Sequence, residues 1–216
     1  MANLVLILKK YLTVWIIVAL FASTSCIQSQ YQSPDEEIKS FPADYSNLIP
    51  LEIGDWVLRM GKDTDSHLIR QISKGRFSHI GIVVEVEPAV KIVHAIHDEN
   101  SGESGVLYSD LQSFVAPNVA EYFAVLRMAN VSKQQQKNIV NHIQQQIGQP
   151  FILNTRQEKH LYCTTLIYDA ILQVKPDFSI QWSKVNFPPF SGEYLFPLAF
   201  EQYSQLEMIY SSQNFK

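Results

Sequence analysis

The hydrophobic positions between residues 53 and 174 follow the two periods that mark strands and helices. Runs rich in Val and Ile predict a short strand after the turn at 53–54 and further strands over 79–86, 90–96, 106–108 and 122–128. The runs at 79–86 and 90–96 flank a turn that contains Pro88, which predicts a β-hairpin. Apolar residues spaced three or four apart predict helices over 63–73, 132–147 and 163–174. This mixture of elements predicts an α+β domain.

Capping residues define several of these boundaries. Asp63 is suited to cap the first helix, and Ser132 with Gln135 three residues later has the capping-box pattern for the second. Ser109 is expected to cap a short helix that follows it. After Pro176 the chain is aromatic and proline-rich, and we expect this tail to lie across the domain surface.

Composition and charge narrow the range of functions. Hydrophobic residues make up 46% of the 216 residues and charged residues 18%, which is typical of one globular domain with a full core. The formal net charge is −4, and no cluster of Lys and Arg is interleaved with aromatic residues. Nucleic acid is therefore not an expected partner.

The N-terminus has the pattern of a secretory signal. Lys9 and Lys10 precede an apolar run over 11–22, which is shorter than the roughly 20 residues that a membrane-spanning helix needs. Small residues follow that run, so we assign residues 1–25 to a signal peptide. Residues 26–47 are polar with few apolar side chains and predict a tether. The folded domain is then expected over residues 48–216.

Cys26 directly follows small residues, as the lipidated Cys does in a bacterial lipobox, although Ser23 stands where that motif usually has Leu. This pattern predicts lipidation at Cys26. A cleaved soluble protein and an uncleaved membrane anchor are the alternatives. All three place the domain outside the cytoplasm, and we expect it in the bacterial cell envelope, in the periplasm or anchored at the outer membrane. The membrane is then a partner through the signal or the lipid anchor.

Cys163 is the candidate nucleophile. If Cys26 is lipidated, Cys163 has no disulfide partner within the chain, because these are the two cysteines of the sequence. The helical pattern begins at Cys163, and a helix N-terminus favours a thiolate and offers N–H groups to an oxyanion. The alternative interpretation is a small buried hydrophobic residue, which is common for a free Cys.

His79 is the best placed of the six histidines to act as the base, since it begins a Val- and Ile-rich strand directly after the small Ser78. His94 lies inside the next strand and is suited to orient the His79 ring as a third member. The alternatives are a surface histidine at a strand end and a hydrogen-bonded core histidine. For the triad to form, we expect the hairpin register to put both rings on the sheet face that meets the Cys163 helix, aided by a bulge near residues 85–90.

A metal centre is not expected at these residues. A zinc site from His79, His94 or His160 with Cys163 is conceivable, but no CxxC or HxxxH pair supports it. We therefore predict no metal and no cofactor.

Four short segments, taken in order, resemble the YiiX/YebB-like group of NlpC-type cysteine hydrolases. They are Gly54-Asp55-Trp56-Val57, then Phe77 to Val83 with the pattern Ser-His-x-Gly-Ile, then Ile92 to Ile96, and then Tyr162 to Ile167. The resemblance implies a circularly permuted papain-like fold of the NlpC type, α+β, in which a small antiparallel sheet packs on the helix that bears the nucleophilic Cys. It also implies Cys163 as nucleophile, His79 as base and His94 as the third polar residue.

Two departures from the family pattern concern the substrate pocket. Family members often have Ser-Glu after the cysteine, where this chain has Thr164-Thr165. They also often have an acidic residue where Ile152 stands.

The resemblance and the residues together predict a thiol hydrolase that cleaves an amide bond, peptide or isopeptide-like, through an acyl-enzyme on Cys163 with His79 as general base. The expected substrate is a small-molecule, peptide or cell-wall amide. One alternative is an acyltransferase or lipid deacylase of the lecithin:retinol acyltransferase-like type, whose acyl groove the aromatic tail would supply. The other is a non-catalytic binding protein of the envelope.

Overall fold

The computed structural model describes residue 45 and residues 49–97, 102–188 and 190–213. The predicted signal peptide over 1–25, Cys26 and all of the predicted tether except Tyr45 lie outside this part of the chain. Tyr45 is buried, and its ring packs edge-on against Phe123 with 5.0 Å between the ring centroids. In the described segments, no helix has both the length and the apolar character needed to span a membrane.

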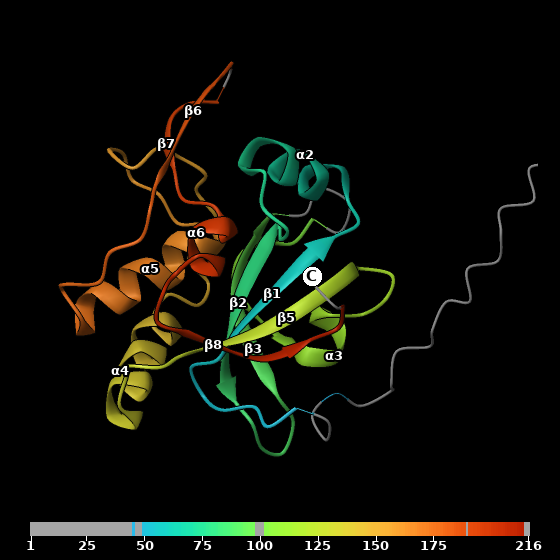
Figure 1. Ribbon diagram of the computed structural model, residues 1–216, viewed down its shortest axis with the longest axis vertical. Helices are drawn as coiled ribbons and strands as arrows, with labels where there is room; N and C mark the ends of the chain where they lie inside the picture. The colour runs from blue at the N-terminus through green and yellow to red at the C-terminus, as the bar shows by residue number, and fades with distance from the viewer. Residues whose placement is uncertain (1–44, 46–48, 98–101, 189, 214–216) are drawn as a thin grey trace, which may run out of the picture. The chain divides into compact units, whose positions relative to one another are not determined.

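Six strands form one sheet in which all neighbours are antiparallel. The strands are β1 (Trp56–Gly61), β2 (His79–Glu85), β3 (Lys91–His97), β4 (Ser104–Asp110), β5 (Ala120–Met128) and β8 (Leu206–Ser211). Their order across the sheet is β4-β3-β2-β1-β5-β8, and Figure 1 shows β8 beside β5. A separate two-stranded hairpin consists of β6 (Ser183–Phe187) and β7 (Phe190–Tyr194).

The helices are α2 (Thr64–Ser73), α3 (Leu111–Phe114), α4 (Lys133–Gln144), α5 (Cys163–Val174) and α6 (Pro197–Glu201). Helix α5 begins at Cys163, as the periodicity predicted. The side chain of Asp63 caps α2, and Ser132 and Gln135 form the predicted capping box on α4. The predicted cap at Ser109 is wrong, because Ser109 still belongs to β4 and the N-cap residue of α3 is Asp110.

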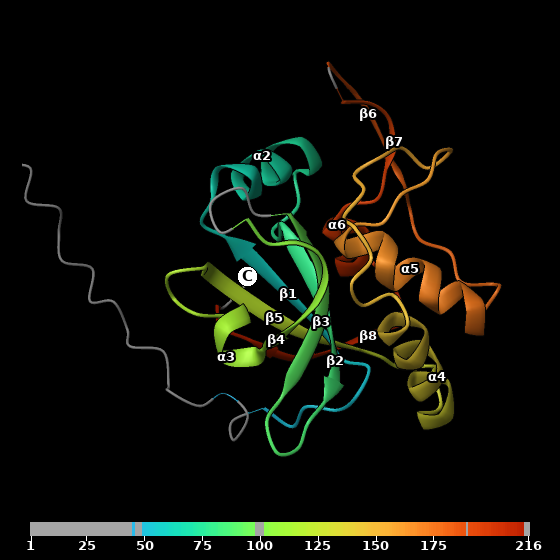
Figure 2. The same cartoon turned by 180° about the vertical axis from the view of Figure 1, so that it is seen from behind.

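The sheet separates two hydrophobic cores. The larger core contains alternate strand residues, such as Ile80 and Ile82 of β2, together with the inward faces of α4 and α5. The smaller core contains the intervening residues, such as Val83 of β2, together with Phe114 of α3 and Tyr45. Figure 2 shows α3 on one side of the sheet and α4 and α5 on the other. The predicted α+β class, with an antiparallel sheet packed on the helix that begins at Cys163, is confirmed.

The expected surface tail is the main error in the predicted fold. After the β6–β7 hairpin the chain returns to the domain, where Leu195 and Phe200 are buried in the larger core. The following strand, β8, then pairs with β5, with Val125 opposite Tyr210. The tail therefore completes the sheet.

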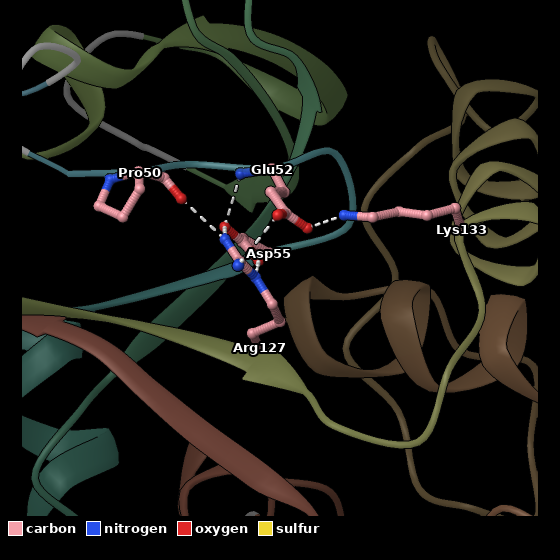
Figure 3. A network of polar contacts seen from close by, with 5 residues as sticks. All are labelled: Pro50, Glu52, Asp55, Arg127 and Lys133. Atoms are coloured by element: carbon pink, nitrogen blue, oxygen red, sulfur yellow. Dashed lines mark hydrogen bonds and ion pairs between the residues drawn. The ribbon is translucent and has the colours of Figure 1, made fainter.

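A buried ion pair fixes the start of the central strand (Figure 3). The Asp55 carboxylate is fully buried and accepts hydrogen bonds from Arg127 Nε at 2.6 Å and Arg127 Nη2 at 2.8 Å. The backbone N–H of Glu52 donates to the same carboxylate at 2.7 Å. Arg127 also donates to the Pro50 carbonyl, and Glu52 pairs with Lys133 at the start of α4. The Gly-Asp motif of the sequence is therefore structural.

Replacing Asp55 with Ala should destabilise the protein by about 3 to 5 kcal/mol, because it leaves the Arg127 guanidinium without its buried partner. Urea unfolding followed by circular dichroism measures the change. Lys133→Ala is the matched control, since it removes the exposed end of the same network and should cost no more than about 1 kcal/mol. Equal effects of the two variants would contradict the structural role of the buried pair.

Candidate active site

Three side chains from successive strands form a hydrogen-bonded chain. His79 begins β2, and its Nε2 lies 2.9 Å from Nδ1 of His94 on β3. The other ring nitrogen of His94, Nε2, lies 2.8 Å from Oγ of Ser109 on β4. His94 is buried, with 2% of its surface exposed, whereas His79 and Ser109 are partly exposed. The predicted contact between His94 and His79 is therefore present. The hydrogen-bonded chain also includes a third residue, Ser109, which the sequence did not indicate.

The two imidazole rings do share a sheet face, but it is the face of the smaller core. Strand alternation puts His79 with Val83 and His94 with Ile92, and both of these apolar residues belong to the smaller core. Phe114 packs against both rings, with centroid distances of 5.6 Å to His79 and 5.0 Å to His94. The expectation that both rings face the Cys163 helix is wrong. The expected register irregularity is present between Val83 and Glu85, at the edge of the predicted interval.

Close packing explains why Gly81, two residues after His79 in this strand, has no side chain. A Cβ atom at Gly81 would lie 2.5 Å from Cγ2 of Ile92 and 3.3 Å from the Phe114 ring. The missing side chain therefore leaves room for Phe114 to pack on the two histidines.

Cys163 reaches this site from the other side of the sheet, where strands β2 and β3 separate. The β2–β3 ladder ends at the pair of Ile82 with Val93, whereas the β1–β2 ladder continues as far as His79. The backbone N–H of Ile80, the residue after His79, lies close enough to the Cys163 sulfur to lower the pKa of the thiol. In a fully paired β2–β3 ladder this N–H group would donate a hydrogen bond to β3.

The start of α5 is held by buried polar contacts. The Thr165 hydroxyl accepts the N–H of Tyr162 at 2.9 Å, and the Thr164 hydroxyl donates to the Leu195 carbonyl at 2.7 Å. The Tyr162 hydroxyl in turn accepts the N–H of Leu195 at 2.9 Å. The Thr-Thr pair that departs from the family pattern thus joins the Cys163 helix to the segment after β7.

The thiol and the imidazoles are all held in their neutral forms. Burial raises the pKa of the Cys163 thiol to about 11, which outweighs the stabilising effects of the neighbouring N–H groups and of Arg59. Burial also holds the pKa of His79 well below its usual range, and it lowers the pKa of His94 to about 3. Among the described residues, no hydrogen bond joins the sulfur to an imidazole nitrogen. The helix N-terminus therefore does not produce the resting thiolate that the sequence suggested.

Arg59 was not predicted to belong to the site. It lies on β1 directly opposite His79, and only 8% of its surface is exposed. Its Nη1 donates to the Phe114 carbonyl at 2.6 Å, and its guanidinium lies 4.4 Å from the centre of the Phe114 ring. Its charge lowers the pKa of both histidines and of Cys163. The paired register of β1 and β2 would have identified Arg59, but that register cannot be read from the sequence.

Comparison with known proteins identifies the family. Residues 52–186 match the model of the permuted papain-like amidase family YaeF/YiiX, also called the C92 family. The chain belongs to this family. The permuted papain-like fold of the C92 amidases thus accounts for the order of elements, in which the Cys helix follows the His strands. None of the curated proteins compared with the chain matches it.

A solved structure similar to this C92 member is the metalloprotein YiiX of Escherichia coli O157:H7. The two share 17% sequence identity with a TM-score of 0.62, over 74% of this chain and 97% of the YiiX chain. At this identity the likeness concerns the fold. In the part of this chain that the structure describes, no three His, Cys, Asp or Glu side chains are grouped to hold a metal ion.

The raised thiol pKa predicts how Cys163 reacts with iodoacetamide. In a Cys26→Ser variant, which leaves Cys163 as the single thiol, the alkylation rate should rise with pH and reach half of its maximum at about pH 11. The same chain in denaturant should reach half-maximum near the ordinary thiol pKa of about 8.5. A rate that levels off below pH 8 in the folded protein would instead indicate a preformed thiolate.

Proposed function

We propose that this chain hydrolyses an amide bond, peptide or isopeptide-like, through an acyl-enzyme on Cys163, with His79 as general base and His94 as the residue that orients it. The single observation that carries the proposal is the convergence at the β2–β3 split. There the backbone N–H of Ile80 lies close enough to the sulfur to lower the thiol pKa, while the preceding residue, His79, is hydrogen-bonded to His94 at 2.9 Å. Membership of an amidase family supports the reaction class.

The neutral resting state determines how the proton moves. As the Cys163 sulfur attacks the amide carbonyl carbon, the thiol proton passes to His79 Nδ1, the ring nitrogen that does not contact His94. The imidazolium of His79 then gives this proton to the leaving nitrogen, the C–N bond breaks, and the amine departs. Water attacks the thioester with His79 again as base, which releases the acid and restores the thiol.

Backbone donors supply the stabilisation of the oxyanion. The N–H groups of Ile80, Cys163 and Thr164 all lower the pKa of the Cys163 thiol, so they lie close to the sulfur. The oxyanion forms two bonds away from that sulfur, so donors at the start of α5 lie close to the developing charge. Arg59 adds a positive charge near the same atoms. These groups can therefore stabilise negative charge on the substrate oxygen.

The described residues favour an amide over a lipid substrate. The lipid deacylase alternative relied on an apolar groove built from the aromatic tail. Instead, Leu195 and Phe200 from this tail are buried in the larger core, and β8 completes the sheet. We therefore propose a small-molecule, peptide or cell-wall amide as substrate.

Replacing Cys163 with Ala should lower turnover by roughly 1000-fold or more, because Cys163 carries the one thiol among the described residues and the acyl-enzyme cannot form without it. A panel of peptide and γ-glutamyl amides, together with a fatty-acyl ester, provides the substrates, and mass spectrometry of the trapped enzyme locates the acyl group. His160→Ala is the matched control, since His160 pairs with Asp169 and is not a member of the hydrogen-bonded chain from His79 to Ser109, so it should leave turnover unchanged. Unchanged turnover in Cys163→Ala would contradict the proposal, and turnover of the ester alone would support the lipid alternative.

We also propose that Cys26 carries a lipid anchor and that the protein resides in the cell envelope, as the N-terminal pattern indicates. Replacing Cys26 with Ser should move the protein from the membrane fraction to the soluble fraction, because a lipid anchor acts through its acyl chains alone. Fractionation of expressing cells and intact mass measure the change. Turnover in detergent extracts is the control and should not change. An unchanged mass and an unchanged membrane fraction would show that Cys26 is not lipidated.

A further inference from the structure

Ser109 ends the hydrogen-bond chain that begins at His79. It is the penultimate residue of β4, two positions beyond Leu107, which pairs directly with His94. Ser109 therefore lies diagonally across the ladder from His94 on the same sheet face, which brings its Oγ to 2.8 Å from His94 Nε2. Within the described residues, this is the hydrogen bond that His94 Nε2 makes.

Two arrangements of protons are possible along this chain, because a neutral imidazole has one N–H and one lone pair. In the first, His79 Nε2–H donates to His94 Nδ1, and His94 Nε2–H donates to Ser109. In the second, every bond is reversed, so that Ser109 donates to His94 and the His79 proton lies on Nδ1. Both arrangements satisfy the same heavy-atom distances.

Only the first arrangement permits the proposed chemistry. In the second, His79 Nδ1 carries a proton and cannot accept the one from Cys163. After proton transfer, His79 has an N–H on both nitrogens, so neutral His94 must accept at Nδ1 and donate from Nε2. At that moment Ser109 Oγ has to accept a hydrogen bond.

On the basis of the proposed function, we propose that Ser109 is a positioning residue that accepts the His94 Nε2–H and thereby holds His79 in the tautomer with a free Nδ1. A hydroxyl suits this role because it accepts without adding charge. Arg59, opposite His79 on β1, already supplies one positive charge to the site. The nearest carboxylate on the strand, Asp110, points to the other face and is paired with Lys91 at 2.5 Å.

The first experiment compares turnover in three variants of β4. Ser109→Ala removes the acceptor and leaves the His94 N–H buried without a partner, so kcat should fall by roughly 5- to 100-fold while KM stays nearly constant. Ser109→Thr retains the hydroxyl and should restore kcat to within about threefold. Ser104→Ala is the matched control, because Ser104 makes a similar bond to His97 between the same two strands, at 3.1 Å and outside the site. Equal kcat values in Ser109→Ala and the wild type would overturn the proposal.

The second experiment measures the tautomers directly and needs no substrate. Nitrogen-15 NMR of histidine-labelled protein should show the proton of His79 on Nε2 and that of His94 on Nε2 in the wild type. In Ser109→Ala, a measurable share of His79 should move its proton to Nδ1, while Ser104→Ala should match the wild type. A wild-type protein with the His79 proton on Nδ1 would overturn the proposal even if Ser109→Ala did not fold.

The two experiments separate this inference from the proposed function. If Cys163→Ala keeps full turnover, the proposed function fails, while the tautomer measurement still reports on Ser109. If Cys163 is essential but neither kcat nor the tautomers respond to Ser109→Ala, only the role of Ser109 fails.

Discussion

The buried pair of Asp55 and Arg127 is the interaction on which the register of the sheet depends. Asp55 immediately precedes Trp56, and Arg127 follows Leu126, which is the residue opposite Trp56. The carbonyl of Asp55 also accepts the N–H of Val83, so the same residue aligns β1 with β2. A slip of one position would turn every side chain of a strand to the opposite face. The Asp55 carboxylate therefore helps to determine that His79 lies opposite Arg59 and within hydrogen-bond distance of His94.

The site is assembled from both sides of the sheet. The histidines belong to the face covered by Phe114, whereas the Cys163 helix packs on the opposite face. They meet where the pairing of β2 with β3 ends near His79, so that the Ile80 N–H lies close to the sulfur. This placement explains the neutral thiol: the helix N-terminus stabilises an anion by a modest amount, and removal of the sulfur from water opposes it more strongly.

Local signals predicted the elements of the fold well, and non-local pairing limited what the sequence could show. The capping box at Ser132 and the start of α5 at Cys163 depend on residues a few positions apart, and both are confirmed. The pairing of Val125 with Tyr210 joins residues far apart in sequence, and β8 is only half-buried, so its pattern resembles that of a surface segment. The face of the histidines and the roles of Arg59 and Ser109 depend on register, which no local pattern reveals. The roles of Cys163, His79 and His94 in catalysis remain predictions.

A neutral third member suits a site that already contains Arg59. A carboxylate in place of His94 would raise the pKa of His79 and favour an imidazolium, which has no free lone pair for the thiol proton. With neutral His94, burial and Arg59 together keep the His79 ring unprotonated. In the proposed reaction, proton transfer and attack turn a neutral thiol and imidazole into an imidazolium and an oxyanion. Arg59 opposes the first charge and stabilises the second, while the backbone donors at the start of α5 stabilise the oxyanion alone.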